Sequence, residues 1–172
     1  MHSFDNLELR AIELDDTDMI YEIENDVEAW KYGDIVAPIS KRILEDYALT
    51  YDADPFISGQ LRLIIQEINK KRPIGIIDLY DITQRHKRAF VGIYILKKYR
   101  YNGLGGKSLN LIEEYAKNTL HLNQLGAKID VSNKISLNLF EKKGFIVRGI
   151  LPQWIEVENA KFTDLKIYSK FI

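Results

Sequence analysis

Three glycines stand between a basic run and an amphipathic stretch in KKYRYNGLGGKSLNLIEEYAK, residues 97–117. A helix that begins after such a turn presents four backbone N–H groups without partners, and its dipole makes that end positive. Glycine lets the backbone wrap closely around an anion. Gly103, Gly105 and Gly106 therefore predict a phosphate cradle. The alternative is a tight strand-to-helix turn that binds nothing.

The glycine spacing argues against two nucleotide-binding motifs. A Walker A loop built on the letters GGKS would need a glycine where the chain has Tyr101. A dinucleotide fingerprint that starts at Gly103 would need a glycine where the chain has Ser108. Nucleotide hydrolysis and NAD chemistry therefore both lose support.

The composition predicts one globular domain over residues 1–172, because 46% of the residues are apolar and 28% are charged. The formal net charge of -1 gives no electrostatic reason to expect a nucleic acid or a membrane surface as a partner. No apolar run approaches the roughly 20 residues that span a bilayer, and the first 16 residues lack the apolar core of a signal peptide.

The chain contains no cysteine, which excludes disulfides, thiolate metal sites and a cysteine nucleophile and fits a cytoplasmic protein. The three histidines are scattered along the sequence, so no metal site is expected.

Hydrophobic periodicity and turn residues predict the elements that position the glycine turn. Strands are expected over 7–14, 61–68, 74–82, 89–96, 127–131, 144–151 and 162–172, and helices over 15–30, 40–51, 104–120 and 133–143. Hairpins and helical crossovers alternate in this order, so the fold class is α+β with a mixed sheet. Gly92, inside the strand 89–96, predicts a bulge or a close backbone approach.

Several stretches together resemble the GNAT N-acetyltransferases. RYNGLG, from Arg100 to Gly105, is similar to the family loop R/Q-x-x-G-x-G/A, and NKISLNLFEKKGF, from Asn133 to Phe145, resembles the second cofactor motif. The segments before, between and after these motifs look like the branch that contains the spermidine acetyltransferases and the ribosomal-protein N-terminal acetyltransferases. The resemblance covers nearly the whole chain, with the motifs in the family's order.

This resemblance implies a GNAT-like mixed, splayed sheet flanked by helices, with acetyl-CoA as cosubstrate. The strand before the loop would pair with the pantetheine arm, the loop would hold the pyrophosphate, and the second motif would contact the cofactor. For the second motif, the alternatives are a helix N-cap at Asn133, core packing at Phe140 and a surface position for Lys142. The implied cofactor-binding residues are Ile93, Tyr94, Ile95, Arg100, Tyr101, Asn102, Gly103, Leu104, Gly105, Gly106, Lys107, Asn133, Ser136, Phe140 and Lys142.

Two acid–base positions that the family commonly uses are apolar here. The tyrosine that protonates the leaving sulfur is replaced by Phe140, and a glutamate that opens the fourth strand is replaced by Phe90. Three explanations stay open: catalysis by positioning with water relaying protons, substitution by other groups with Asp78 as the candidate base, or acyl-CoA binding without catalysis. Weaker substitutes are Tyr80, Asp81, Tyr94 and Asp130, for which the alternative is a structural hydrogen bond.

The resemblance implies an acetyl-CoA-dependent N-acetyltransferase that acts on a primary amine by direct attack in a ternary complex. The acceptor is left open between a polyamine, a protein N-terminus, an amino sugar and another small amine; the alternative function is a non-catalytic acyl-CoA-binding or assembly protein. The resemblance to this branch also suggests a homo-oligomer. Seven acidic residues in and around the first expected helix suggest an acidic pocket for a polyamine, and the alternative is a solvated helix face. These residues are Asp15, Asp16, Asp18, Glu22, Glu24, Asp26 and Glu28.

Three aromatic residues could line the acceptor pocket, and the alternative is core packing. They are Trp30, Tyr32 and Trp154.

Overall fold

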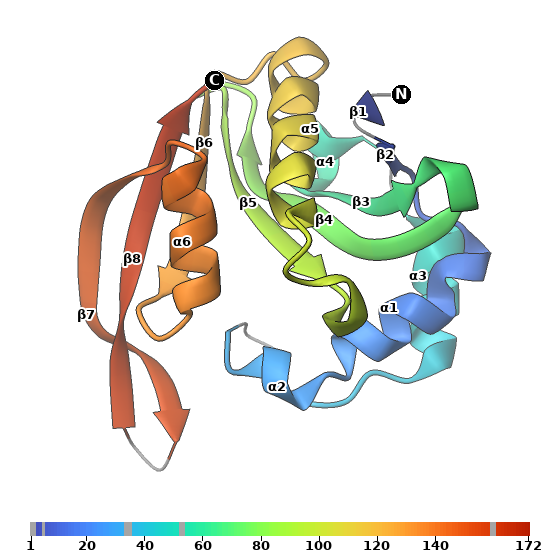
Figure 1. The fold of residues 1–172 in the computed structure, drawn as a ribbon, viewed down its shortest axis with the longest axis horizontal. Coiled ribbons are helices and arrows are strands. Elements are labelled where there is room, and N and C mark those ends of the chain that lie inside the picture. The colour runs from blue at the N-terminus through green and yellow to red at the C-terminus, as the bar shows by residue number, and fades with distance from the viewer. Residues whose placement is uncertain (1–2, 5, 33–35, 52–53, 159–160) are drawn as a thin grey trace.

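The structure, a computed structural model, describes residues 3–4, 6–32, 36–51, 54–158 and 161–172 (Figure 1). Within these ranges one eight-stranded sheet has the order β1-β2-β3-β4-β5-β6-β8-β7. Neighbouring strands are antiparallel except β5 and β6, which are parallel, so the predicted mixed sheet and α+β class are confirmed. The strands are β1 Ser3–Phe4, β2 Leu7–Arg10, β3 Leu61–Glu67, β4 Arg72–Thr83, β5 Arg88–Ile95, β6 Gln124–Asp130, β7 Ile146–Glu158 and β8 Lys161–Phe171.

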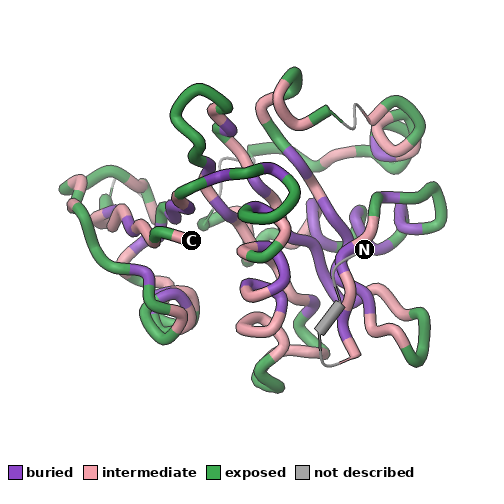
Figure 2. Tube along the Cα trace, turned by 90° about the horizontal axis from the view of Figure 1, so that it is seen from above, coloured by how far each residue is buried: buried purple, intermediate pink, exposed green. Residues whose placement is uncertain are grey.

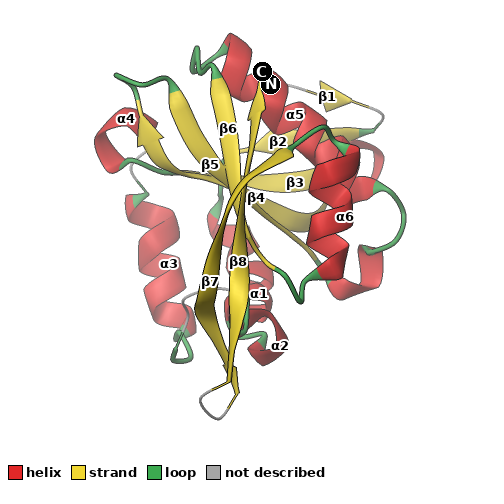
Figure 3. Cartoon of the chain, turned by 90° about the vertical axis from the view of Figure 1, so that its left-hand side faces the viewer, coloured by secondary structure: helices red, strands yellow, loops and turns green. Residues whose placement is uncertain are grey.

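Helices cover both faces of the sheet, with α3 on one side and α5 and α6 on the other (Figure 3). None of the helices in the described ranges is both long and apolar enough to cross a membrane. The α-helices are α1 Thr17–Glu24, α2 Val27–Trp30, α3 Lys41–Thr50, α4 Pro55–Ser58, α5 Leu104–Asn118 and α6 Lys134–Lys142, and the 3₁₀ turns are η1 Leu14–Asp16, η2 Ile68–Lys70 and η3 Lys97–Tyr99.

The two faces of the sheet build two apolar clusters, because successive side chains of a strand point to opposite faces. Leu63 and Ile77 belong to the larger cluster, which includes residues of α5 and α6. Ile64 and Ile76 belong to the smaller cluster with residues of α1 and α3. Buried segments accordingly concentrate in the central strands and the inner sides of the helices (Figure 2).

Local sequence signals set several helix boundaries where they were expected. The Ser40 hydroxyl accepts a hydrogen bond of 3.3 Å from the Ile43 N–H and caps α3. Asn133 caps α6 in the same way, through a bond of 3.1 Å from the Ser136 N–H. Gly144 follows α6 with a φ of 82°, a left-handed conformation that glycine adopts without a steric penalty.

The single helix expected over 15–30 is wrong, since the chain forms η1, α1 and α2 there. Tertiary hydrogen bonds explain the break between α1 and α2. The Asn25 side chain bonds to both the N–H and the carbonyl of Ile39, and the Asp26 carboxylate caps α2 at the Glu28 N–H. These partners lie outside any helical repeat, so periodicity alone could not indicate the break.

The first strand is also shorter than expected, because β2 ends at Arg10. The Arg10 guanidinium holds the buried Asp16 carboxylate through bonds of 2.6 and 2.7 Å, and this pair folds the following residues into η1. The short β1 and α4 were not anticipated from the sequence.

The sheet splays between β5 and β6. These strands pair only at Arg88↔Gln124, Ala89↔Leu125 and Phe90↔Gly126, although β5 continues to Ile95 and β6 to Asp130. The two parts of the sheet separate beyond this seam (Figure 1). The splayed sheet implied by the family resemblance is therefore confirmed.

The bulge or close backbone approach expected at Gly92 is wrong. Gly92 pairs in regular register with Asp78, and the irregularity of this hairpin lies farther on, between Tyr80 and Thr83. Among the residues that the structure describes, a Cβ added at Gly92 would touch only the Tyr80 ring, at 3.8 Å. The fold itself gives no reason for a glycine at this position.

Candidate active site

The glycine turn leads directly into α5. Gly103 occupies the N-cap position with a φ of 71°, and within the described ranges no side chain caps this helix. The N–H groups of the first helical turn, at Leu104, Gly105 and Gly106, are those that a helix leaves without intrahelical partners. The helix start is therefore an open donor site of positive potential, which fits an anion such as a pyrophosphate.

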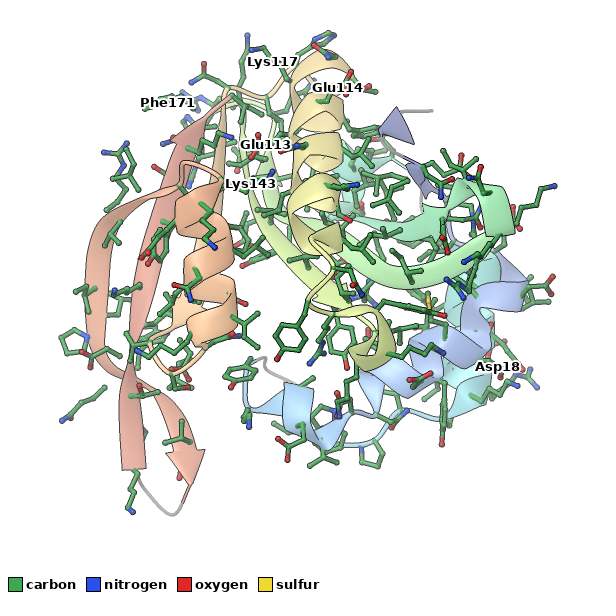
Figure 4. The ribbon with its side chains drawn as sticks, in the orientation of Figure 1. Asp18, Glu113, Glu114, Lys117, Lys143 and Phe171 are labelled. Atoms are coloured by element: carbon green, nitrogen blue, oxygen red, sulfur yellow. The ribbon has the colours of Figure 1, made fainter. Side chains whose placement is uncertain are left out.

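The two later glycines also have a packing role. A Cβ added at Gly105 would lie 3.3 Å from Leu139, and one added at Gly106 would lie 2.8 Å from Cε of Lys143. Leu139 lies in α6 and Lys143 directly follows this helix. Lys143, which lies between α6 and α5 (Figure 4), bonds to Asn110 at 2.8 Å. A side chain at Gly105 would thus require Leu139 to shift by a few tenths of an ångström, whereas the flexible end of Lys143 could move away from a side chain at Gly106. At Gly103 it is the positive φ that favours glycine.

Arg100 ties the loop to the end of β5. Its Nε donates a bond of 2.8 Å to the Ile95 carbonyl, and its guanidinium lies 4.9 Å from the Tyr94 ring centroid. The Asn102 side chain donates to the carbonyls of Tyr99 and Arg100 and closes the turn. These contacts fix the loop next to the unpaired part of β5.

The implied pantetheine positions, Ile93, Tyr94 and Ile95, all lie on β5 beyond its last pair with β6. Within the described ranges no strand pairs with that edge, although the Ile95 carbonyl accepts a bond from Arg100. An amide-rich chain could pair with the other backbone groups of this edge as an added strand does. The structure therefore brings these three residues and the glycine turn together at one end of β5.

Residues of the second motif have clear structural roles. Asn133 is the N-cap of α6, as its alternative interpretation predicted. Phe140 is only 2% exposed and packs edge-on against Phe145, with 4.9 Å between the ring centroids. Lys142 is exposed, as is Tyr101 in the turn, while Ser136 and Lys107 are half-buried. Contacts of this motif with a cofactor stay predictions.

A pocket of about 460 Å³ lies on the opposite face of the sheet, between α1, α3, β3 and β4. Apolar and aromatic side chains make up most of its wall, with a few polar groups among them. Its lining residues are Glu24, Ile39, Ile43, Leu44, Tyr47, Gln60, Leu61, Arg62, Asp78, Leu79 and Tyr80.

Three charged side chains meet in the pocket wall. Arg62 donates from Nε and Nη2 to the two oxygens of Asp78, at 2.8 and 2.9 Å, and from Nη1 to Glu24. Burial alone would lower the pKa of Arg62, but attraction to Asp78 and Glu24 outweighs it and raises this pKa above its usual value. The cluster of one cation and two carboxylates carries a net charge of about -1, which favours a cationic ligand.

The candidate base Asp78 lies in the pocket wall, but Arg62 holds both of its oxygens. In this geometry the Arg62 cation balances the charge of the Asp78 carboxylate. The role of Asp78 as a base stays a prediction. Tyr80 also lines the pocket, Asp81 is exposed and paired with Lys128, and Tyr94 donates to Asp26.

Asp130 is the remaining weaker candidate. It is 5% exposed at the end of β6, and its Oδ1 accepts bonds from the Ser132 N–H and Thr163. Its Oδ2 is buried and has no hydrogen-bond partner among the described residues.

The acidic first segment contributes little to the pocket. Glu24 lines it, but Asp18 lies on the outer side of α1 (Figure 4) and pairs with Lys41. Asp26 is held by Tyr94 and Lys97.

None of the aromatic candidates Trp30, Tyr32 and Trp154 lines the pocket, and Trp154 is 61% exposed on β7.

The sequence analysis did not identify Arg62 as a pocket residue. The signal was a lone arginine inside the otherwise apolar stretch LRLII.

Comparison with known proteins places this geometry in context. The domain family described as "Acetyltransferase (GNAT) domain" matches residues 6–146. An uncharacterized N-acetyltransferase of Bacillus subtilis, YoaA, is 27% identical over 96% of this chain and 93% of its own length. The spermidine N(1)-acetyltransferase of Escherichia coli K12 is 24% identical over 88% of this chain and 78% of its own length.

Solved structures share the fold. The crystal structure of spermidine N-acetyltransferase from Vibrio cholerae, in complex with CoA and spermine, superposes with a TM-score of 0.85 at 24% identity, covering 96% of this chain and 95% of that one. The family match ends at residue 146, so one domain over residues 1–172 stays a prediction.

Proposed function

Because the chain belongs to the GNAT acetyltransferase domain family, we propose that it is an acetyl-CoA-dependent N-acetyltransferase that acts on a primary amine. One observation carries this proposal: β5 continues past its last pair with β6 at Phe90, and its free end runs to the turn that starts α5. The pocket with the Arg62 cluster lies on the other face of the same sheet. A cofactor groove and an acceptor pocket would thus meet at the splay.

The cosubstrate would bind along β5 and at the α5 N-terminus. The N–H groups of Leu104, Gly105 and Gly106 would hold the pyrophosphate. The free edge of β5 at Ile93 to Ile95 would pair with the amide-rich arm. Acetyl-CoA supplies the thioester, whose carbonyl carbon is attacked by the amine nitrogen.

The chain's own groups would act mainly by orientation and electrostatics. The amine nitrogen forms a bond to the carbonyl carbon, the C–S bond breaks, the sulfur leaves as a thiolate that takes a proton, and the amine loses one. Backbone N–H donors on β5 would stabilise the charge on the carbonyl oxygen. Phe140 cannot supply the proton, so water would relay it. Orientation of the reactants can lower the barrier by several kcal/mol, roughly 7–11 in the best cases. General acid–base catalysis typically raises the rate by about 10²–10⁴-fold.

The acceptor amine would enter the pocket, whose charged cluster attracts an ammonium group before it loses its proton. A polyamine, a protein N-terminus and an amino sugar are the acceptor classes considered. A cytoplasmic location belongs to the same proposal and is supported by the lack of cysteine in the sequence. We also propose self-association through β7, an edge strand with exposed apolar side chains.

Calorimetry with CoA tests the cofactor site. Wild type is expected to bind with micromolar affinity, and Gly103→Glu is expected to lose binding because it places a carboxylate beside the pyrophosphate. Gly59→Glu is a matched control, since Gly59 has the same φ of 71° and the same open surroundings but ends α4. Binding that survives in Gly103→Glu, or that vanishes equally in Gly59→Glu, contradicts the assignment.

Thiol release with a panel of amines separates an enzyme from a non-catalytic acyl-CoA-binding protein. Phe90 and Phe140 are the specific features that favour the second candidate. Release of CoA that depends on an added amine supports the enzyme. Tight CoA binding without amine-dependent release would support the alternative.

A further inference from the structure

Gly92 is a glycine that the fold does not require. It lies in the middle of β5 in regular register with Asp78, and among the described residues a Cβ added there would contact only the Tyr80 ring, at 3.8 Å. Glycine within a strand is less favourable than alanine by roughly 0.5–1 kcal/mol. An unexplained glycine in a strand often marks a place where a ligand approaches closely.

The missing side chain leaves a gap in a row of rings. Directly paired residues of neighbouring strands point to the same face, so Phe90, Gly92 and Tyr94 share the face of Asp78 and the pocket. Phe90 stacks on Tyr80 with 5.7 Å between the centroids. Tyr94 is held at its hydroxyl by a bond of 2.5 Å to Asp26. Both rings beside Gly92 are therefore held by neighbours, and the space of the missing side chain between them borders the Tyr80 ring.

This gap lies where the pocket meets the splay. Gly92 comes two residues after Phe90, the last residue of β5 that pairs with β6. Across the hairpin it faces Asp78, which lines the pocket wall. A group that leaves the pocket over Gly92 reaches the free edge of β5 without passing another side chain of that strand.

We propose that Gly92 is a specificity-determining residue: the gap over it admits a primary amine carried on an unbranched carbon from the pocket to the thioester. The inference rests on the function proposed above and narrows its acceptor class. An amine on a CH₂ group is narrow enough to fit the space that the missing side chain of Gly92 leaves. An amine on a branched carbon is wider and would clash with the Phe90 or Tyr94 ring. The nitrogen must come within about 3–3.5 Å of the carbonyl carbon for the C–N bond to form as the C–S bond breaks.

Two amines of equal composition test the wild type, butylamine and its branched isomer 2-aminobutane. We expect kcat/KM to favour butylamine roughly 10- to 200-fold, the discrimination that one methyl group provides in a tight site. Equal turnover of the two isomers overturns the proposal.

Gly92→Val fills the gap with a residue that suits a strand. We expect butylamine turnover to fall about 100-fold or more, as for a misplaced reactant, with CoA affinity unchanged. Gly149→Val is the control on another strand, because Gly149 lies in β7 and no atom of the described residues is within 4 Å of its added Cβ. Turnover retained in Gly92→Val, or CoA affinity lost there, contradicts the proposal.

A binding experiment needs no turnover. The probe is CoA joined through its sulfur and an acetyl carbon to butylamine, an N-butylacetamide whose butyl group must pass the gap. We expect this conjugate to bind the wild type and Gly149→Val at least about tenfold more tightly than CoA, and Gly92→Val no more tightly than CoA. A conjugate without advantage in the wild type overturns the Gly92 proposal, while absence of CoA binding overturns the proposed function instead.

Discussion

The Tyr94 hydroxyl donates a hydrogen bond of 2.5 Å to the Asp26 carboxylate and thereby joins the splayed strand β5 to the start of α2. Lys97 adds a second bond to the same carboxylate, at 2.9 Å. One acidic side chain thus fixes both the ring beside Gly92 and the break between α1 and α2.

Replacing Asp26 should change stability in acid. Burial would raise the pKa of Asp26, but the bonds from Tyr94 and Lys97 lower it below the ordinary value of 3.8. A lowered folded pKa stabilises the protein above the unfolded value, and this contribution is lost as pH falls through the folded pKa. We expect Asp26→Asn to be less stable than wild type at neutral pH and to approach it as the pH falls below 3.8. Urea unfolding at several pH values measures the difference, and a constant difference down to pH 2 would contradict it.

Alkali should destabilise the fold through three buried or half-buried tyrosines. Burial raises the pKa of Tyr47, Tyr94 and Tyr168 to about 12, with help at Tyr94 from Asp26 and at Tyr168 from Glu141. A raised pKa stabilises the fold below the unfolded value of 10, and this stability is lost as pH rises toward 12. Absorbance titration should show these tyrosines ionising last, and Tyr94→Phe should lose stability less steeply over this range. Ionisation of every tyrosine near 10 in the folded protein would count against the burial argument.

Removing Arg62 should strongly destabilise the protein, because Glu24 and Asp78 would be left without their cation. We expect Arg62→Met to cost about 3–5 kcal/mol of unfolding free energy. The triple variant with Glu24→Gln and Asp78→Asn should regain most of it. Arg42→Met is the control, since the exposed Arg42–Asp46 pair of α3 is worth about 0.3–0.5 kcal/mol. Equal costs for Arg62→Met and Arg42→Met would contradict the cluster's structural role.

Two strand glycines should respond oppositely to alanine. A Cβ at Gly75 would lie 2.2 Å from the Tyr94 carbonyl oxygen, so Gly75→Ala must displace backbone and should cost about 1–3 kcal/mol or more. Gly92→Ala has open space and should gain roughly 0.5–1 kcal/mol. Denaturant midpoints of the two variants measure this contrast. A destabilised Gly92→Ala would show that the fold does need this glycine.

The exposed edge of the sheet should mediate self-association. Ile146, Ile150 and Trp154 on β7 are 57%, 51% and 61% exposed, and unpaired edges with apolar side chains attract partners. Sedimentation velocity should show an oligomer for wild type and a smaller species for Trp154→Lys. Ile43→Lys on α3, which is 60% exposed elsewhere, serves as the control. A monomeric wild type at micromolar concentration would contradict the proposal.

Signals that lie within a few residues were readable from the sequence. Ser40 and Asn133 cap helices through residues three positions away, at the starts of the helices expected over 40–51 and 133–143. The partners of Asp26 lie 68 and 71 residues away and those of Arg62 lie 38 and 16 residues away, so no local pattern could indicate them. The splay was predicted from the family resemblance alone, because hydrophobic periodicity does not indicate how many residues of two parallel strands are paired.

The seam of three residue pairs between β5 and β6 has a mechanical consequence. It divides the sheet into two parts, β1 to β5 and β6 to β8. The Lys170–Glu113 ion pair of 2.6 Å also connects them, because it joins β8 to α5, which packs against β2 and β5. A cofactor arm paired along the free edge of β5 would fill the space between the two parts of the sheet and would restrict their motion relative to each other. Ligand binding and stiffening would then be one event, so amide hydrogen exchange along β5 and β6 should slow together when CoA is added.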